Sequence, residues 1–140
     1  MGVLVHRSFP DELANGVVIT TNLFRKEFNG ITVNIQKGEN SVVKPNKGEV
    51  CEQFTAYDLN LFGTKNRNLD VDYISNSTLN DNKPLLSISE INNLYKACKT
   101  IETKINQYWN KFNKKPVDIE FKIVGENRAL YIKQARVFND

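Results

Sequence analysis

The sequence predicts an α+β domain: a mostly antiparallel β-sheet backed by one long helix and ending in a β-hairpin. Three observations carry this prediction. Short β-branched runs are separated by turn residues, and the strongest helical periodicity of the chain spans residues 87–112. Two alternating segments, 117–123 and 130–136, flank a short polar turn. Alternation with a period of two is typical of strands with one buried face.

Length and composition fit one globular domain. The chain has 140 residues, so we treat residues 1–140 as a single domain with room for a real core. Hydrophobic residues make up 40% and charged residues 25%, both ordinary for a soluble protein. No apolar run approaches the roughly 18 residues that a membrane span needs, and no signal peptide opens the sequence. We therefore expect a cytoplasmic protein without membrane contact.

Charge and cysteine usage exclude several classes of site. The net charge of +3 is mild and the lysines form no basic stripe, so a nucleic-acid partner is not expected. Cys51 and Cys98 match neither a zinc pattern nor a disulfide framework, which indicates reduced thiols. His6 is the only histidine, so a zinc site built on several histidines is excluded.

The first half of the chain reads as a series of strands. Residues 1–6 and the β-branched run 16–21 are predicted strands, separated by a turn at 9–12. The dipeptide at 29–30, Asn-Gly, is typical of hairpin turns and precedes an alternating strand at 31–36.

The middle of the chain is less regular. Residues 41–43 form a short extended piece before Pro45, and 49–57 are the next predicted strand. Residues 60–83 are rich in Asn, Asp and Ser and show little periodicity, so we expect an excursion or mobile loop.

One capped helix follows. Ser87 and Glu90 have the spacing of a capping box, and Pro116 ends the helical pattern. The apolar residues at helical spacing are Ile88, Ile91, Leu94, Cys98, Ile101, Ile105, Tyr108, Trp109 and Phe112. They predict a helix that packs on the sheet, with Tyr108 and Trp109 as core anchors.

The closing hairpin carries the candidate chemistry. On its first arm Asp118, Glu120 and Lys122 face away from the apolar residues. On its second arm the alternation predicts a common face for Leu130, Ile132, Gln134 and Arg136. A turn centred on 126–128 places Glu120 opposite Gln134 and Asp118 opposite Arg136. Carboxylates suit Mg²⁺ and a guanidinium suits phosphate. The same pattern also fits a solvated surface with cross-strand ion pairs.

Several segments together resemble a known family. They are residues 3–9, the run at 12–22 with its Gly-Val-Val-Ile-Thr strand, the segment 44–53, and the arms Asp-Ile-Glu at 118–120 and Leu-Tyr-Ile-Lys-Gln-Ala-Arg at 130–136. The chain resembles the second half of the nucleotide-binding domain of phosphoenolpyruvate synthase and pyruvate phosphate dikinase. This resemblance implies the C-terminal lobe of an ATP-grasp-like fold. Segment 44–53 departs from the family pattern, because a Lys stands for its Asn and a Cys for its second Pro.

The resemblance implies a role for each polar residue of the hairpin. Glu120 would ligate Mg²⁺, and Gln134 and Arg136 would contact the ATP phosphates as catalytic groups. Asp118 would be an auxiliary acidic group in cofactor binding. Such a set suits phosphoryl transfer, which depends mainly on positioning and charge neutralisation.

The resemblance also implies partners. In the family ATP phosphorylates a histidine of another domain, and the phosphoryl group then passes to pyruvate. We expect the N-terminal lobe and the phosphohistidine domain to lie elsewhere in a longer polypeptide, so this chain would be a fragment that is inactive alone. The surroundings of His6 do not match the phosphohistidine motif. Sheet surface that normally faces the missing lobe would favour a homodimer.

Two other interpretations remain open from the sequence. The chain could be a non-catalytic binding or interaction module that retains the fold, with residues 60–83 as a docking loop. A weaker alternative is an RNA-binding domain. Its aromatic residues Phe24, Phe28, Phe54 and Tyr57 do not form an obvious stacking platform interleaved with Arg.

Overall fold

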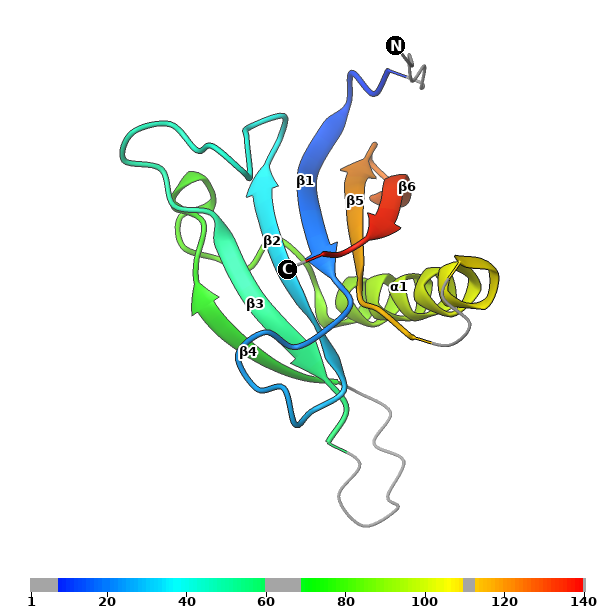
Figure 1. Ribbon diagram of the computed structural model, residues 1–140. Helices are drawn as coiled ribbons and strands as arrows, with labels where there is room; N and C mark the ends of the chain where they lie inside the picture. Colours follow the sequence, from blue (N-terminus) through cyan, green and yellow to red (C-terminus); the bar gives the residue numbers. More distant parts are fainter. Residues whose placement is uncertain (1–7, 60–68, 110–112, 140) are drawn as a thin grey trace.

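The computed structural model describes residues 8–59, 69–109 and 113–139 (Figure 1). Its elements, in chain order, are β1 (Glu12–Ile19), β2 (Gly30–Lys37), β3 (Glu52–Tyr57), β4 (Asp70–Ser75), the short 3-10 helix η2 (Thr78–Asn80), α1 (Ile88–Trp109), β5 (Val117–Val124) and β6 (Ala129–Val137). The predicted strand at 1–6, with His6, lies outside the described residues.

The strands form one six-stranded sheet in the order β4-β3-β2-β1-β5-β6. Every neighbouring pair is antiparallel. Helix α1 lies behind this sheet in Figure 1 and covers one of its faces. The predicted α+β class, with one long helix and a closing β5–β6 hairpin, is confirmed. We call the opposite face, which carries Asn15, Val17, Asp118, Glu120 and Gln134, the open face.

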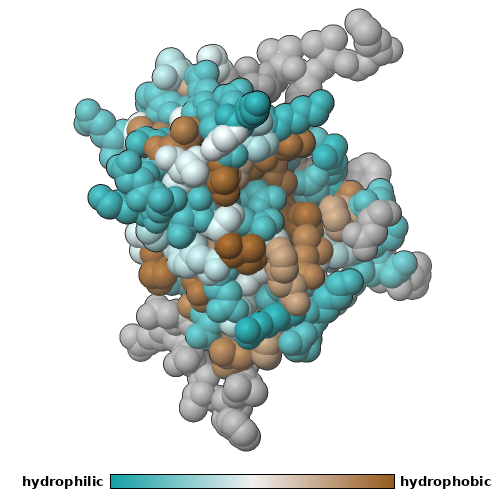
Figure 2. Space-filling model, turned by 90° about the vertical axis from the view of Figure 1, so that its left-hand side faces the viewer, coloured by the Kyte–Doolittle hydropathy of each residue, from teal (hydrophilic) through white to brown (hydrophobic). Residues whose placement is uncertain are grey.

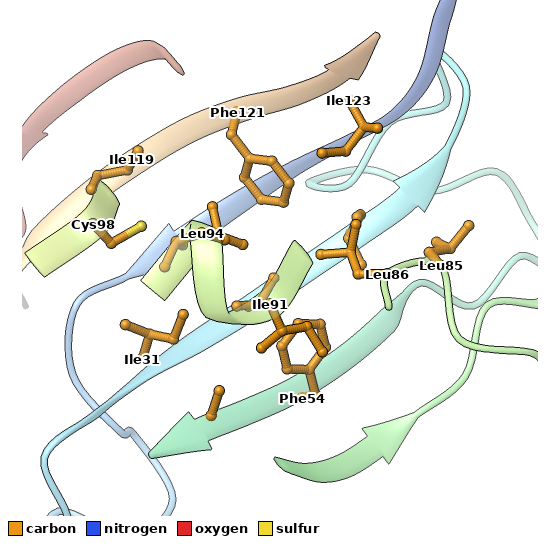
Figure 3. Close-up of a cluster of buried hydrophobic side chains, with 14 of the residues drawn as sticks. Ile31, Phe54, Leu85, Leu86, Ile91, Leu94, Cys98, Ile119, Phe121 and Ile123 are labelled. Atoms are coloured by element: carbon orange, nitrogen blue, oxygen red, sulfur yellow. The ribbon is translucent and has the colours of Figure 1, made fainter. Parts of the chain in front are cut away.

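The core lies between α1 and the sheet. Figure 3 shows Ile91 and Leu94 of α1 among strand residues such as Phe54 and Phe121, all nearly or fully buried. A Cβ added to Gly16 would lie 2.5 Å from Cε1 of Phe121, so the ring occupies the room that a side chain on β1 would take. The glycine is therefore part of the packing between β1 and β5.

The predicted capping box begins α1. The backbone N–H of Ser87 donates to Glu90 Oε2 (2.7 Å), and the N–H of Glu90 donates to Ser87 Oγ (3.3 Å). The prediction that Tyr108 anchors the helix in the core is wrong, because Tyr108 is 81% exposed. The last turns of α1 extend past the β5–β6 edge in Figure 1. The apolar stripe of the helix is therefore longer than the sheet on which it packs. The side chain of Trp109 and all of Phe112 lie outside the described residues.

The predicted excursion at 60–83 is partly wrong. Residues 70–75 form β4, which pairs with β3, and residues 78–80 form η2. Tyr73 packs against Phe54 with ring centroids 5.6 Å apart. Local sequence periodicity does not predict such a tertiary contact. Residues 60–68 lie outside the description.

The β4 side of the molecule is a mixed surface. Figure 2 shows hydrophobic side chains lying among hydrophilic ones on this side, and Ile74 of β4 is 45% exposed. The homodimer expected from the sequence stays a prediction. In the described part of the chain, no helix has the length and apolar character that crossing a membrane requires.

One carboxyl group lies on the helix side of the sheet. Glu52 is fully buried, its Oε2 accepts a hydrogen bond from the N–H of Leu85 (2.8 Å), and its Oε1 has no partner among the described residues. Burial raises the pKa of the Glu52 carboxyl above its ordinary value, and the bond from Leu85 opposes this shift. The folded chain therefore holds this proton to higher pH than the unfolded chain does.

The raised pKa of Glu52 predicts a pH-dependent loss of stability. The stabilising contribution of the protonated group is full below the ordinary pKa and is lost as pH rises through the folded pKa. Glu52→Gln keeps an acceptor for Leu85 and cannot ionise, so the variant should gain stability over the wild type between pH 4 and pH 8. Urea unfolding across this range measures the difference. Glu126→Gln, at an exposed turn residue, is the control, and a constant difference between Glu52→Gln and wild type would contradict the assignment.

Candidate functional site

The connection between β1 and β2 covers part of the open face. The N–H of Leu23 donates to Thr32 Oγ1 (3.0 Å), and the ring of Phe28 stacks on Tyr57 with centroids 5.2 Å apart. Arg25 forms an ion pair with Asp72 of β4 (3.8 Å). These contacts place residues 20–29 over β2, β3 and β4. These contacts leave the open face over β1, β5 and β6 uncovered by this connection.

The β5–β6 register brings the predicted site residues together. Asp118 pairs with Arg136, and Glu120 pairs with Gln134, as the sequence predicts. Nε and Nη2 of Arg136 donate to the same oxygen, Asp118 Oδ2, at 2.9 and 2.7 Å. These hydrogen bonds and the Asp118 charge raise the pKa of the Arg136 guanidinium. The Arg136 side chain is 65% exposed, so its remaining N–H groups are accessible to solvent.

A β-bulge changes the phase of β6. The register shifts between the Glu120–Gln134 pair and the next pair, Phe121–Ile132, so Lys133 is the extra residue. The predicted common face for all four alternating residues is therefore wrong. Ile132 pairs with Phe121 on the helix side of the sheet, while Gln134 lies on the open face. Without the bulge, either the apolar or the polar pair would point to the wrong side.

The bulge adds a cation that the sequence interpretation missed. Nζ of Lys133 lies 3.7 Å from Glu120 Oε2, and the two side chains are 26% and 39% exposed. The sequence does contain a pattern that indicates the bulge. Ile132 and Gln134 fall on the same alternation, although one is apolar and the other polar, and a strand with one buried face accommodates both only through a change of phase.

A cavity of about 460 Å³ opens on this part of the open face. Its lining residues are Ser8, Phe9, Glu12, Asn15, Gly16, Val17, Glu39, Ser41, Val42, Val43, Glu120, Phe121, Lys122 and Lys133. Nδ2 of Asn15 donates to the carbonyl oxygens of Gly38 (2.7 Å) and Asn40 (2.9 Å), which holds the β2–β3 connection beside β1. The cavity therefore has a fixed wall and a floor made of sheet side chains.

A second ion pair, between Lys122 and Glu12, lies in the lining of the cavity. Lys122 pairs with Glu12, whose side chain is only 2% exposed, and the Lys122 ammonium also lies 5.6 Å from the centroid of the Phe9 ring. A carboxylate this buried needs its cation. We assign a structural role to Lys122, in contrast to the partly exposed Lys133.

The hairpin provides oxygen ligands that fit a cation delivered with a phosphate. Asp118 Oδ1 is buried and has no hydrogen-bond partner among the described residues. Glu120 lies two residues along the same strand, and Gln134, whose side-chain amide has an oxygen, pairs with Glu120 across the hairpin. Within the described ranges no group of three or more His, Cys, Asp or Glu residues could hold a metal. Mg²⁺ usually takes one or two carboxylates together with phosphate oxygens and water, so two carboxylates suffice for that ion.

A larger cavity of about 720 Å³ lies elsewhere, between residues 20–30 and the second half of α1. None of the predicted site residues lines it, whereas Glu120 lines the cavity of about 460 Å³ and the other three predicted site residues lie on the hairpin outside that lining. Its central polar groups satisfy one another, because Thr20 Oγ1 (2.6 Å) and Lys99 Nζ (3.0 Å) both donate to Glu102. We therefore place the candidate site at the smaller cavity and the adjoining hairpin.

Comparison with known proteins adds no family. A scan against protein-family models finds no match, and a search of the curated proteins finds none either. The functional interpretation therefore rests on the geometry of the open face and on the motifs in the sequence.

The two lysines of the cavity should differ in their effect on stability. Lys122→Met leaves the buried Glu12 carboxylate without its cation and should lower the free energy of unfolding by about 3 kcal/mol. Lys133→Met breaks a longer, partly exposed pair and should change it by less than about 1 kcal/mol. Urea unfolding of both variants at pH 7 measures the difference. Equal losses would show that the environments of the two lysines are wrongly assigned.

Proposed function

We propose that the open face of β1, β5 and β6 binds magnesium-complexed ATP through its phosphates. In this proposal the chain is the C-terminal half of the nucleotide site of a phosphotransferase similar to phosphoenolpyruvate synthase and pyruvate phosphate dikinase. The observation that carries it is the pairing of Asp118 with Arg136 and of Glu120 with Gln134 on the face that α1 leaves free.

The arrangement of charges supports this proposal over a purely structural surface. A surface salt bridge satisfies both partners, but here Asp118 keeps one buried oxygen without a partner. Glu120 contacts Lys133 at a distance longer than a hydrogen bond, and its charge also acts on the Arg136 guanidinium. Both carboxylates therefore retain capacity for a cation. Arg136 keeps exposed donors that a phosphate oxygen can accept.

Each residue has a defined part in the proposed site. Glu120 would ligate the magnesium ion, with Asp118 as an auxiliary acceptor beside it. Gln134 would orient the metal or a phosphate oxygen through its amide. Arg136 would contact the phosphates and neutralise charge on the transferring group, which a lysine cannot do with the same two-pronged geometry.

The bound ligand would supply the phosphoryl group and most of the metal's oxygen ligands. The chain's own contribution is binding, orientation and charge neutralisation, which account for most of the catalysis in phosphoryl transfer. The pair between Asp118 and Arg136 fixes the guanidinium before a ligand arrives, so less side-chain entropy is lost on binding. The sequence resemblance implies that the phosphoryl acceptor is a histidine in another domain.

Calorimetric titration of the chain with ATP tests the proposal. The affinity for ATP should be higher with Mg²⁺ than without it. In the presence of Mg²⁺, Glu120→Gln should lower this affinity by at least about tenfold. Arg136→Lys should weaken ATP binding under both conditions, because it loses the forked contact.

Glu126→Gln, which removes one exposed carboxylate at the β5–β6 turn, is the matched control and should bind as the wild type does. Two results would overturn the proposal. One is an affinity for ATP that does not respond to Mg²⁺. The other is normal binding by both Glu120→Gln and Arg136→Lys in variants with wild-type stability.

A further inference from the structure

We infer that Lys133 is a phosphate-contacting residue that exchanges partners when the ligand binds: it leaves Glu120 for a phosphate oxygen as Mg²⁺ takes that carboxylate. This inference rests on the proposed function and adds a residue to it. Neither the predicted ligand set nor the predicted phosphate contacts include Lys133.

The backbone supplies the first argument. Lys133 is the inserted residue of the β6 bulge. Ile132 pairs with Phe121 on the helix side, so alternation from Ile132 places Lys133 on the open face, and the bulge places Gln134 on that face as well. Lys133 and Gln134 therefore both oppose Glu120. Its ammonium reaches the open face and lines the cavity beside Glu120 and Lys122. Bulges are frequent next to active sites, and this one lets two consecutive side chains of β6 face the proposed site.

The charges supply the second argument. At 3.7 Å the Lys133–Glu120 contact is an ion pair without a hydrogen bond, and both groups are partly exposed. Such a pair is weak enough to separate. A divalent cation on Glu120 would repel the ammonium next to it, and the phosphate that accompanies the cation would attract it. One lysine can thus neutralise Glu120 without ligand and a phosphate oxygen with ligand.

The comparison with Lys122 supplies the third argument. The ammonium of Lys122 lines the same cavity, but its pair with the buried Glu12 carboxylate cannot be released without leaving that charge uncompensated. Lys133 is the cation of this cavity whose partner, Glu120, is also the proposed metal ligand. It is therefore the lysine that a phosphate would recruit.

Two probes test the exchange on the chain itself. The first is the affinity for inorganic tripolyphosphate with excess Mg²⁺, measured by calorimetry. The second is the affinity for Mn²⁺ alone, measured by electron paramagnetic resonance. The variants are Lys133→Met and Lys133→Arg, with Lys104→Met on the exposed surface of α1 as the charge-matched control.

The exchange predicts opposite signs for the two probes. Lys133→Met should bind magnesium tripolyphosphate about tenfold more weakly, because a charge-assisted contact is lost. It should bind Mn²⁺ alone about threefold more tightly, because the cation that competes for Glu120 is gone. Lys133→Arg should retain most of the wild-type affinity for tripolyphosphate. A lysine with only a structural role would move both affinities in the same direction or neither.

The outcomes separate this inference from the proposed function. If Glu120→Gln and Arg136→Lys weaken tripolyphosphate binding while Lys133→Met matches Lys104→Met, the exchange is overturned and the proposed function stands. If the wild-type chain does not bind magnesium tripolyphosphate at millimolar concentrations, both fail. Binding that is insensitive to Glu120→Gln and Arg136→Lys also overturns both.

Discussion

The account depends on the pairing register of β5 and β6, and on the single bulge that changes it. On one side of the bulge, Asp118 and Glu120 meet Arg136 and Gln134 on the open face. On the other side, Phe121 and Ile123 meet Ile132 and Leu130 on the helix side. A strand with strict alternation cannot place both sets correctly, since a slip of one residue exchanges its faces. The bulge lets one short hairpin contribute to the core and present a polar face at the same time.

The rest of the fold holds this hairpin in place. β1 pairs with β5 along its length, and Gly16 leaves room for the Phe121 ring against α1. Asn15 on the same strand ties down the wall of the cavity, and the buried Glu12 carboxylate pairs with Lys122 of β5. β1 therefore supports β5 through packing on one face and through polar contacts on the other. The side chains that hold the fold, such as Glu12 and Lys122, thus differ from those that would exchange partners in the proposed site, such as Lys133 and Glu120. This difference lets a ligand bind without breaking the contacts that stabilise the fold.

Most of the architecture could be predicted from local patterns, and the errors have physical causes. The capping box at Ser87, the long helix and the pairing of Asp118 with Arg136 and of Glu120 with Gln134 follow from short-range chemistry and appear as predicted. β4 was not predicted, because its strand character comes from pairing with β3 and from the contact of Tyr73 with Phe54. Tyr108 fits the apolar stripe of α1 by its spacing but is exposed. It belongs to the last turn of α1, and the end of this helix extends past the β5–β6 edge in Figure 1. Lys133 was missed because a simple alternation contains no bulge. The roles of Glu120, Gln134 and Arg136 come from the sequence resemblance and stay a proposal.

The most direct test of the central claim is to locate a bound metal–nucleotide complex on the sheet. Paramagnetic broadening of backbone amide signals by Mn²⁺-ATP reports distance from the metal and does not depend on any substitution. The account predicts the strongest broadening at β5 and β6 around Glu120 and Gln134, weaker effects along β1, and little effect on α1, which lies behind the sheet. Broadening centred on α1 and residues 20–30, around the larger cavity, would contradict it.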